Sequence, residues 1–228
     1  MSVLSYLQDR ANWSGPGAIT DLALQHLAWT GVAVLAAAAV GIPLGLLVGH
    51  TGRGALLVTG LRRATRALPS VALLFLAVLL LGTGAGDVVV VLAVLAVPTV
   101  LTEVAAGIAG ADREAVRAGR ALGMTEGQVL TRVEWPLALP RVVAGLRGAT
   151  LQVVATATVA ALATDGGLGL LITRGQAQGD QPQMVAGALL VAALAVLLGL
   201  VWSGLGWLAA RRARVPVSPV PAFAVAPA

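Results

Sequence analysis

The side chains with the most chemistry to offer lie in one charged stretch of an otherwise apolar chain. This stretch runs from Asp112 to Pro136 and carries acids, arginines and amides, whereas the sequence on both sides is almost purely Ala, Val, Leu and Gly. Charged groups are costly in a lipid core and are rare there. We therefore expect this insert, residues 112–136, to lie in water and to dock a partner.

Local signals predict two short helices within the insert. Asp112 is a favourable N-cap, and Gly123 a favourable residue after the C-terminus, for a helix over 113–122. Thr125 and Gln128 have the spacing of a capping box, which predicts a second helix that ends before Pro136. Two capped helices suit a rigid protruding element, although an ordinary polar loop with two helical turns would give the same signals.

Composition places the chain in a membrane. Its 228 residues are 58% hydrophobic and 11% charged, with a mean hydropathy of +0.91, whereas soluble domains carry about 25% charged residues. The lack of cysteine excludes disulfides and Cys-bound metals, and the separated His26 and His50 disfavour a His-based metal site. The arginines are spread along the chain without a basic face, so nucleic-acid binding is not expected.

Apolar runs predict an all-α polytopic membrane bundle of about five transmembrane helices. A helix of about 20 residues crosses a core of about 30 Å. The expected spans cover 27–48, 67–83, 88–108, 137–163 and 184–208. An interfacial helix over 55–66 precedes the second span, with a bend at Pro69, and residues 164–183 are expected to form a polar, Gly-rich loop. The first 25 residues show no signal peptide.

The arginines orient these spans. With five crossings, 13 of the 15 arginines fall on one side, and the other side keeps only Arg10 and Arg174. Because arginine favours the cytoplasmic side, the loop over 109–136 and the C-terminus are expected in the cytoplasm and the N-terminus outside. A six-span alternative would divide the arginines of 55–83. The expected domains are an extracytoplasmic segment 1–26, a transmembrane domain 27–208 and a disordered cytoplasmic tail 209–228.

Polar side chains within the spans mark a candidate translocation path. Gln152 and Thr156 lie four residues apart on one face of the fourth span, with Thr158 nearby. Such side chains face protein or a water-filled path, so hydrogen bonding between helices is the alternative for each. Glu103 lies near the cytoplasmic end of the third span, where pairing with a loop arginine is the alternative. Asp165 lies at the outer end of the fourth, where it would meet a cationic solute, a binding protein or only water.

The sequence contains no arrangement typical of catalysis or nucleotide binding. A phosphate-binding loop of the Gly-x-x-x-x-Gly-Lys-[Ser/Thr] type needs a lysine, and the chain has none. Neither a Ser/His/Asp set nor a carboxylate pair stands out. No aromatic cage is evident, because Trp29, Trp135, Trp202 and Trp207 are expected at membrane interfaces. We expect no enzyme activity, no cofactor and no metal in this chain.

The insert keeps the spacing of a known loop motif. Arg117-Ala118-Gly119 is followed by Gly123, and nine residues separate Gly123 from Val133-Glu134-Trp135-Pro136. In this respect the chain resembles the permease subunits of bacterial ATP-binding-cassette importers, whose motif begins Glu-Ala-Ala. Arg117 replaces the leading Glu, and Glu114 lies one turn earlier. The residues expected to couple to an ATPase are Asp112, Glu114, Arg117, Ala118, Gly119, Gly123, Met124, Thr125, Glu134 and Pro136.

Other segments resemble the osmoprotectant branch of that family, which moves glycine betaine, carnitine, choline and related amines. They are 25–30, 41–45, 66–74, 137–147, 152–158 and 166–169, within about 22–182. The resemblance implies a permease of a bacterial plasma (inner) membrane whose insert carries the coupling helix. It also implies as partners an ATPase subunit that binds the ATP, an extracytoplasmic substrate-binding protein, a second permease copy or related permease, and the lipid membrane.

Two other functions remain as alternatives. The same machine could import another small solute, such as methionine or another amino acid, although 22–49 and 66–74 argue against this. A secondary transporter, or a membrane scaffold without an ATPase, belongs to a different class. A secondary transporter should show inverted repeats and midplane charges, and neither is evident.

Overall fold

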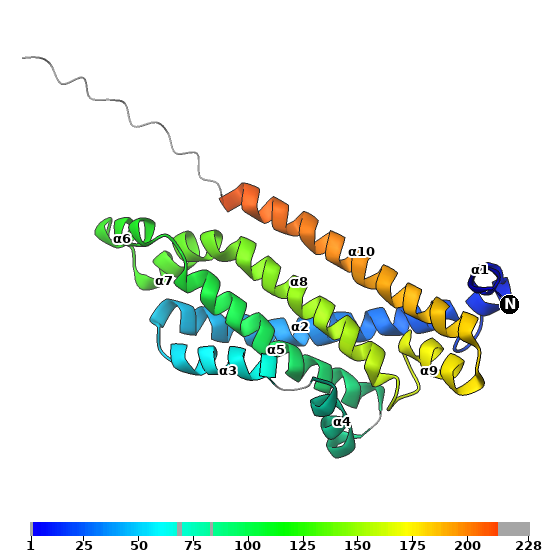
Figure 1. Cartoon of the computed structure of the whole chain (residues 1–228). Helices are drawn as coiled ribbons and strands as arrows, with labels where there is room; N and C mark the ends of the chain where they lie inside the picture. The colour runs from blue at the N-terminus through cyan, green and yellow to red at the C-terminus, as the bar shows by residue number, and fades with distance from the viewer. Residues whose placement is uncertain (1, 68–69, 83, 214–228) are drawn as a thin grey trace, which may run out of the picture.

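The chain folds as a bundle of long helices (Figure 1). The computed structural model describes residues 2–67, 70–82 and 84–213, and this part of the chain is α-helical without strands. Four of its helices are long and apolar enough to cross a membrane. They are α2 (Ile19–Thr51), α5 (Ala85–Ala109), α8 (Trp135–Ala160) and α10 (Gln181–Ala213). The predicted all-α membrane bundle is confirmed.

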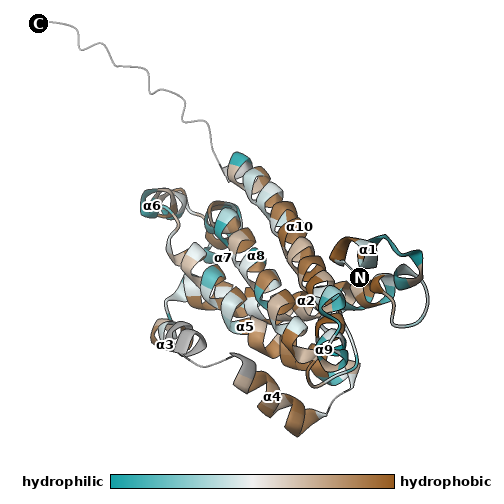
Figure 2. Ribbon diagram, turned by 45° about the vertical axis from the view of Figure 1, so that its right-hand side comes forward, coloured by the Kyte–Doolittle hydropathy of each residue, from teal (hydrophilic) through white to brown (hydrophobic). Residues whose placement is uncertain are grey.

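The main core lies where α2, α5 and α8 pack together, and α10 lies along α8 (Figure 1). Ala37, Val100 and Val153 are examples of its buried side chains, one from each of the three helices. Leucines and valines also cover much of the outer surface, including α4 and α10, which are coloured as hydrophobic in Figure 2. An exposed apolar surface of this extent is typical of a protein that contacts lipid.

Three glycines allow α2 to approach α5 closely. Gly41, Gly45 and Gly49 occur every fourth residue and so share one face of α2. A Cβ atom added at Gly45 would lie 2.7 Å from Cβ of Val104, and one added at Gly49 would lie 2.7 Å from the carbonyl oxygen of Ala105. Small residues at this spacing are common where membrane helices pack backbone to backbone. The α2–α5 contact therefore depends on the absence of these side chains.

The two ends of the bundle differ in charge. The first, called the Arg-rich end, contains the Thr51 end of α2, helix α6 (Arg113–Ala121) and the last turns of α10 (Figure 1). The second, called the opposite end, contains α1 (Val3–Gln8), η1 (Arg10–Trp13) and α9 (Gly169–Gln178). The insert and the N-terminal helix thus lie at opposite ends of the molecule.

The helix predicted over 55–66 is present as α3 (Ala55–Ala67), but the span predicted over 67–83 is replaced by a shorter helix, α4 (Ser70–Leu81). With 12 residues, α4 is about 18 Å long at about 1.5 Å per residue, which is too short for a core of about 30 Å. Together, α3 and α4 return the chain from the Arg-rich end to the start of α5 (Figure 1). The structure described over 2–67, 70–82 and 84–213 therefore has four long candidate spans and one shorter apolar helix, α4. Pro69, the site of the expected bend, lies outside the described residues.

Residues 164–183 contain a helix where the sequence predicts an open loop. Leu170 and Leu171 of α9 are buried in a small second core together with Tyr6 and Ile19. The many glycines and glutamines of this segment conceal its few apolar residues, so periodicity alone gives no helix. Packing of α9 against α10 supplies the stabilisation that the local sequence lacks.

The first and last of the four long helices extend beyond the predicted spans. The first long helix begins at Ile19, so the end of segment 1–26 belongs to α2. The last helix continues to Ala213, so the first five residues of the predicted tail, 209–213, are helical. The guanidinium of Arg211 lies 3.6 Å from the ring centroid of Trp207, one turn earlier, and this cation–π contact favours the helical conformation. Residues 214–228 lie outside the described residues.

Candidate functional site

The first helix of the insert, α6, is fixed by its caps. A side-chain oxygen of Asp112 accepts a hydrogen bond from the backbone N–H of Glu114 at 2.8 Å. The helix ends at Ala121, and Gly123 follows with a φ of +82°, which glycine adopts without strain. The predicted helix over 113–122 is confirmed to within one residue.

The second helix of the insert begins at the predicted capping box. Oγ1 of Thr125 accepts from the N–H of Gln128 at 3.4 Å, and Oε1 of Gln128 accepts from the N–H of Thr125 at 2.9 Å. The result is α7 (Glu126–Val129), whose N-cap and third-residue backbone N–H groups are paired by these two side chains.

The sequence predicts that this helix ends before Pro136, but in the structure it continues past that residue. After α7, a π-helical segment, η2 (Leu130–Glu134), leads directly into α8. The N–H of Trp135 donates to the carbonyl of Leu130, five residues earlier. A proline ring crowds the carbonyl four residues before it in a regular α turn, and the wider π turn relieves this crowding. Pro136 therefore marks a local bulge within one continuous helix.

The residues of the family-like motif divide into a packed set and an exposed set. Gly119 is buried, and a Cβ atom there would lie 3.3 Å from Sδ of Met124 and 3.5 Å from Cγ2 of Val133. Glycine thus lets α6 pack onto the rest of the insert. Ala118 and Glu114 are exposed on α6 and remain accessible to a partner.

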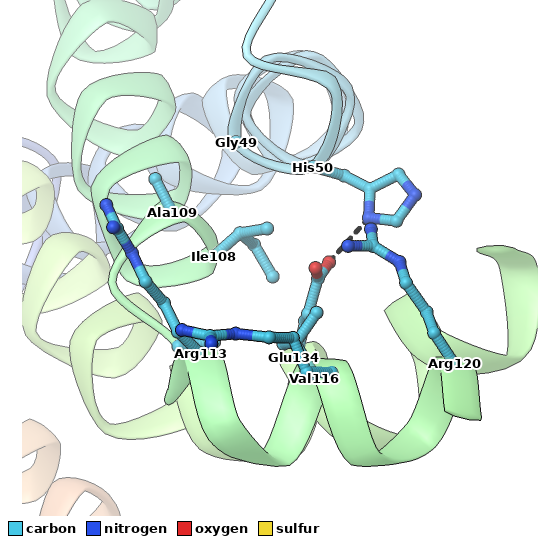
Figure 3. A pocket seen from close by; sticks show the side chains of 10 residues that line it. Gly49, His50, Ile108, Ala109, Arg113, Val116, Arg120 and Glu134 are labelled. Carbon is cyan, nitrogen blue, oxygen red and sulfur yellow. Dashed lines mark hydrogen bonds and ion pairs between the residues drawn. The ribbon is translucent and has the colours of Figure 1, made fainter. Parts of the chain in front are cut away.

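A charged contact joins the insert to the first long helix (Figure 3). Nδ1 of His50, near the end of α2, lies 2.6 Å from Oε2 of Glu134, and its Nε2 lies 3.3 Å from Oε2 of Glu126. The His50 and Glu134 side chains are only 14% and 7% exposed. An imidazole nitrogen that carries a proton can donate to the carboxylate beside it. This contact ties α2 to the continuous helix formed by α7, η2 and α8.

Arg120 extends the same network to α6. Its Nε and Nη2 each donate to a Glu126 oxygen at 2.9 Å, which gives a bidentate pair. These hydrogen bonds, together with the negative charge of Glu126, raise the pKa of the Arg120 guanidinium above its usual value. Because both side chains are exposed, solvent screens the pair, so it orients the helices more than it stabilises them.

A cavity of about 370 Å³ lies between α6 and the ends of α2 and α5 (Figure 3). Arg113, Arg117 and Arg120 line it from α6, on which this spacing places them on one face. Arg113 and Arg117 are exposed, and neither forms a hydrogen bond or ion pair within 2–67, 70–82 and 84–213. The lining thus carries three arginines and one carboxylate, Glu134, which is paired with His50.

Two residues of this site were not predicted as site residues from the sequence. His50 meets Glu134 across 84 positions, so no local pattern could reveal the contact. Leu122 exposes 80% of its surface at the turn between α6 and α7. An apolar residue directly before Gly123 in a polar stretch was the available signal for it. An exposed leucine at the tip of a protruding element suits burial by a partner.

Gln152 connects two spans. Its Nε2 donates to the carbonyl of Leu95, and its Oε1 accepts from Oγ1 of Thr99, at 3.1 and 2.6 Å. Thr156 and Thr158 instead donate to carbonyls four residues earlier in α8, both at 2.8 Å. Of these three polar residues of α8, Gln152 is thus the one whose side chain bonds to another helix.

The two acids of the candidate path lie at opposite ends of α8. Oε2 of Glu103, on α5, lies 3.3 Å from Nε of Arg141, an arginine near the start of α8. A Cβ atom at Gly145 would lie 2.7 Å from Cβ of Glu103, which shows how closely α5 and α8 approach. Asp165 is exposed at the opposite end and lines a separate cavity with Trp29. Trp29 is buried at 6% exposure.

The chain matches one family over most of its length. Residues 41–215, from within α2 to beyond α10, match the binding-protein-dependent transport system inner membrane component. The chain belongs to this family. Membership makes it a multi-pass inner-membrane component of a transport system, not an enzyme of a usual kind.

Curated relatives of this permease carry osmoprotectant names. It is 33% identical over 218 residues to a glycine betaine/carnitine/choline transport system permease protein of Bacillus subtilis, covering 95% of this chain and 93% of that protein. It is 32% identical over 203 residues to an osmoprotectant import permease protein of Salmonella typhimurium, covering 87% of this chain and 92% of that protein.

The fold of this permease is also that of a solved importer. The MetNI methionine ABC transporter, in an inward-facing conformation, superposes with a TM-score of 0.74 at 21% identity. The match covers 84% of this chain and 95% of that one. At this level of identity the likeness shows a shared fold alone.

Proposed function

We propose that this permease forms the membrane path of an ATP-driven importer for quaternary-amine osmoprotectants such as glycine betaine, choline and carnitine. The observation that carries the proposal is the pair of capped helices at the Arg-rich end. They protrude from the apolar bundle, carry an exposed leucine and lie beside an arginine-lined cavity. The named cargo of its relatives supports the substrate class.

The distribution of arginine supports a cytoplasmic position for the Arg-rich end. The insert and the end of α10 carry Arg113, Arg117, Arg120, Arg132 and Arg211, whereas the opposite end holds only Arg10 and Arg174 among the described residues. Arginine near span ends favours the cytoplasmic side of a membrane. In this orientation, α1 and α9 lie outside the plasma membrane and the C-terminus lies inside.

We assign α6 and the α6–α7 turn to the contact with a separate ATPase subunit, which binds and hydrolyses the ATP. Leu122 would enter an apolar recess of the ATPase, and the arginine face of α6 would meet acidic side chains there. His50 and Glu134 would carry the resulting movement to α2 and α8. The permease itself then needs no cofactor or metal.

The other proposed partners follow from the chemistry of the path. A second copy of the chain, or a related permease, completes the pore within the lipid membrane. An extracytoplasmic binding protein supplies high-affinity recognition. Within the permease, Gln152 and Glu103 hold α5 against α8, and Thr156 and Thr158 bond within α8, which leaves Asp165 as the path residue best placed to meet cargo.

Uptake by the assembled importer tests this proposal. The permease, its ATPase and its binding protein are placed in proteoliposomes, and uptake of labelled glycine betaine, choline and carnitine is measured with and without ATP. We expect ATP-dependent uptake of at least one amine. Gly123→Pro should abolish it, because proline cannot adopt the φ of +82°. Gly127→Ala is the matched control, since a Cβ atom there meets nothing within 4 Å.

The outcomes separate the parts of the proposal. Assembly with the ATPase but no uptake of any amine would refute the cargo class and leave an importer of another solute, such as an amino acid. Failure to assemble with the ATPase, or normal uptake by the Gly123→Pro variant, would refute the coupling role of the insert.

A further inference from the structure

A second cavity, of about 260 Å³, lies at the opposite end of the bundle. Gln25 and Trp29 line it from α2, Ala85 from the start of α5, and Thr164 and Asp165 from the segment that joins α8 to α9. Cavities that bind drug-sized ligands measure about 300–1,000 Å³. This one suits a smaller solute.

The walls of this cavity are held in place. The N–H of Gly167 donates to Oε1 of Gln25 at 2.8 Å, and the N–H of Leu168 donates to Nδ1 of His26 at 3.2 Å. The Trp29 ring lies so close to Gly166 that a Cβ atom there would be 2.5 Å from Cη2 of the ring. The joining segment is therefore fixed to α2, and such preorganisation lowers the cost of binding.

Asp165 differs from the other aspartates at this end of the bundle. The other four each accept a hydrogen bond from a nearby backbone N–H: Asp9, Asp21, Asp87 and Asp180. Asp165 is exposed, and among the described residues its carboxylate has no hydrogen-bond or ion-pair partner. Since capping does not occupy it, the carboxylate is available to a cation that enters the cavity.

We propose that this cavity is a weak binding site for the quaternary ammonium group of the cargo, contacted by Asp165 and Trp29. The inference rests on the proposed function, from which it takes the class of ligand. A quaternary ammonium cannot donate an N–H hydrogen bond, so it is recognised by negative charge and by aromatic rings. The cavity offers both, and its described lining contains no basic residue.

Gln25 of the cavity can contact the polar group of such a cargo. Oε1 of Gln25 is occupied by the Gly167 N–H, so its Nε2 is the atom available to donate to a carboxylate or hydroxyl of the ligand. One aromatic ring and one exposed carboxylate give modest affinity. This suits a site that receives cargo from a binding protein and must then release it.

Equilibrium binding tests the site directly. Labelled choline is titrated against the permease–ATPase complex in lipid nanodiscs, without a binding protein. We expect Asp165→Asn to weaken binding by about threefold to tenfold, as expected for one cation contact at an exposed site. Trp29→Leu should weaken it similarly, and Trp29→Phe less, because phenylalanine keeps an aromatic ring. Asp9→Asn, at the same end but outside the cavity, is the matched control and should bind as the unaltered complex does.

A neutral competitor adds a test of charge. 3,3-Dimethyl-1-butanol has the shape of choline without its charge, and it should not displace labelled choline at concentrations where unlabelled choline does. The inference is overturned if the unaltered complex binds no choline, if Asp165→Asn binds as tightly as the unaltered complex, or if the neutral alcohol competes equally. Uptake by the unaltered importer, measured separately, distinguishes failure of this site from failure of the proposed function.

Discussion

The glycine face of α2 gives a prediction that depends only on packing. At Gly45, a new Cβ atom would lie 2.7 Å from Cβ of Val104 and 2.9 Å from the carbonyl oxygen of Leu101. Carbon atoms pack best at about 3.5–4.0 Å, so Gly45→Ala requires the helices to separate by roughly 0.8 Å. Overpacking costs about 1–3 kcal/mol, while replacing glycine with alanine in a helix returns about 1 kcal/mol. We expect a net loss of about 0–2 kcal/mol for Gly45→Ala, and a difference of about 1–3 kcal/mol from a Gly→Ala change at a position with open space.

Thermal unfolding of the purified protein measures this loss. For a chain of this length, each 1 kcal/mol shifts Tm by about 2–4 °C, so Gly45→Ala should lower Tm by up to about 8 °C. Gly31→Ala, in the same helix, is the matched control, because a Cβ atom there meets nothing within 4 Å. Its Tm should stay the same or rise slightly. Equal Tm values for the two variants would show that α2 and α5 do not pack at this distance.

Three further substitutions test the charged and polar contacts. His50→Ala leaves the mostly buried Glu134 without its partner and should destabilise the protein by about 1–3 kcal/mol; in a double-mutant cycle with Glu134→Gln, additive losses of Tm would disprove the link. Arg117→Glu places at this position the glutamate with which the family motif begins, but it adds a negative charge to the arginine face of α6. Because that face is proposed to meet acidic side chains, the variant should bind the ATPase about tenfold more weakly in a titration. Tighter binding would mean that the partner surface is basic. Gln152→Leu removes a contact between helices and should cost about 0.6–2 kcal/mol of stability, measured as a loss of Tm. Thr158→Val is the control, because the Thr158 hydroxyl bonds only within α8. A larger loss of Tm for Thr158→Val would contradict the role of Gln152.

Features governed by neighbouring residues could be predicted from the sequence. The Asp112 cap, the αL glycine at 123 and the Thr125–Gln128 capping box each depend on a few adjacent residues, and the structure has all three. The long spans could be predicted for a similar reason, since about 20 apolar residues suffice to identify a helix that crosses lipid.

Features that depend on distant residues could not be predicted. The helix through Pro136 continues because a π turn accommodates the ring, a choice that the local sequence leaves open. The contact between His50 and Glu134 joins helices that are far apart in sequence, and Trp29 is buried by glycines that follow α8. In each case the deciding partner lies outside any window of sequence that periodicity examines.

The unbroken helix from Glu126 to Ala160 has a mechanical consequence. Its 35 residues form one continuous helix about 50 Å long at about 1.5 Å per residue. A break in the helix at Pro136 would separate movements of the insert from the far end, whereas a continuous helix connects the two. The far end is followed by the segment that holds Asp165 beside Trp29. In the proposed importer, a movement of the insert would therefore reach the cavity lined by Asp165 and Trp29, so that ATP turnover and cargo release would share one helix.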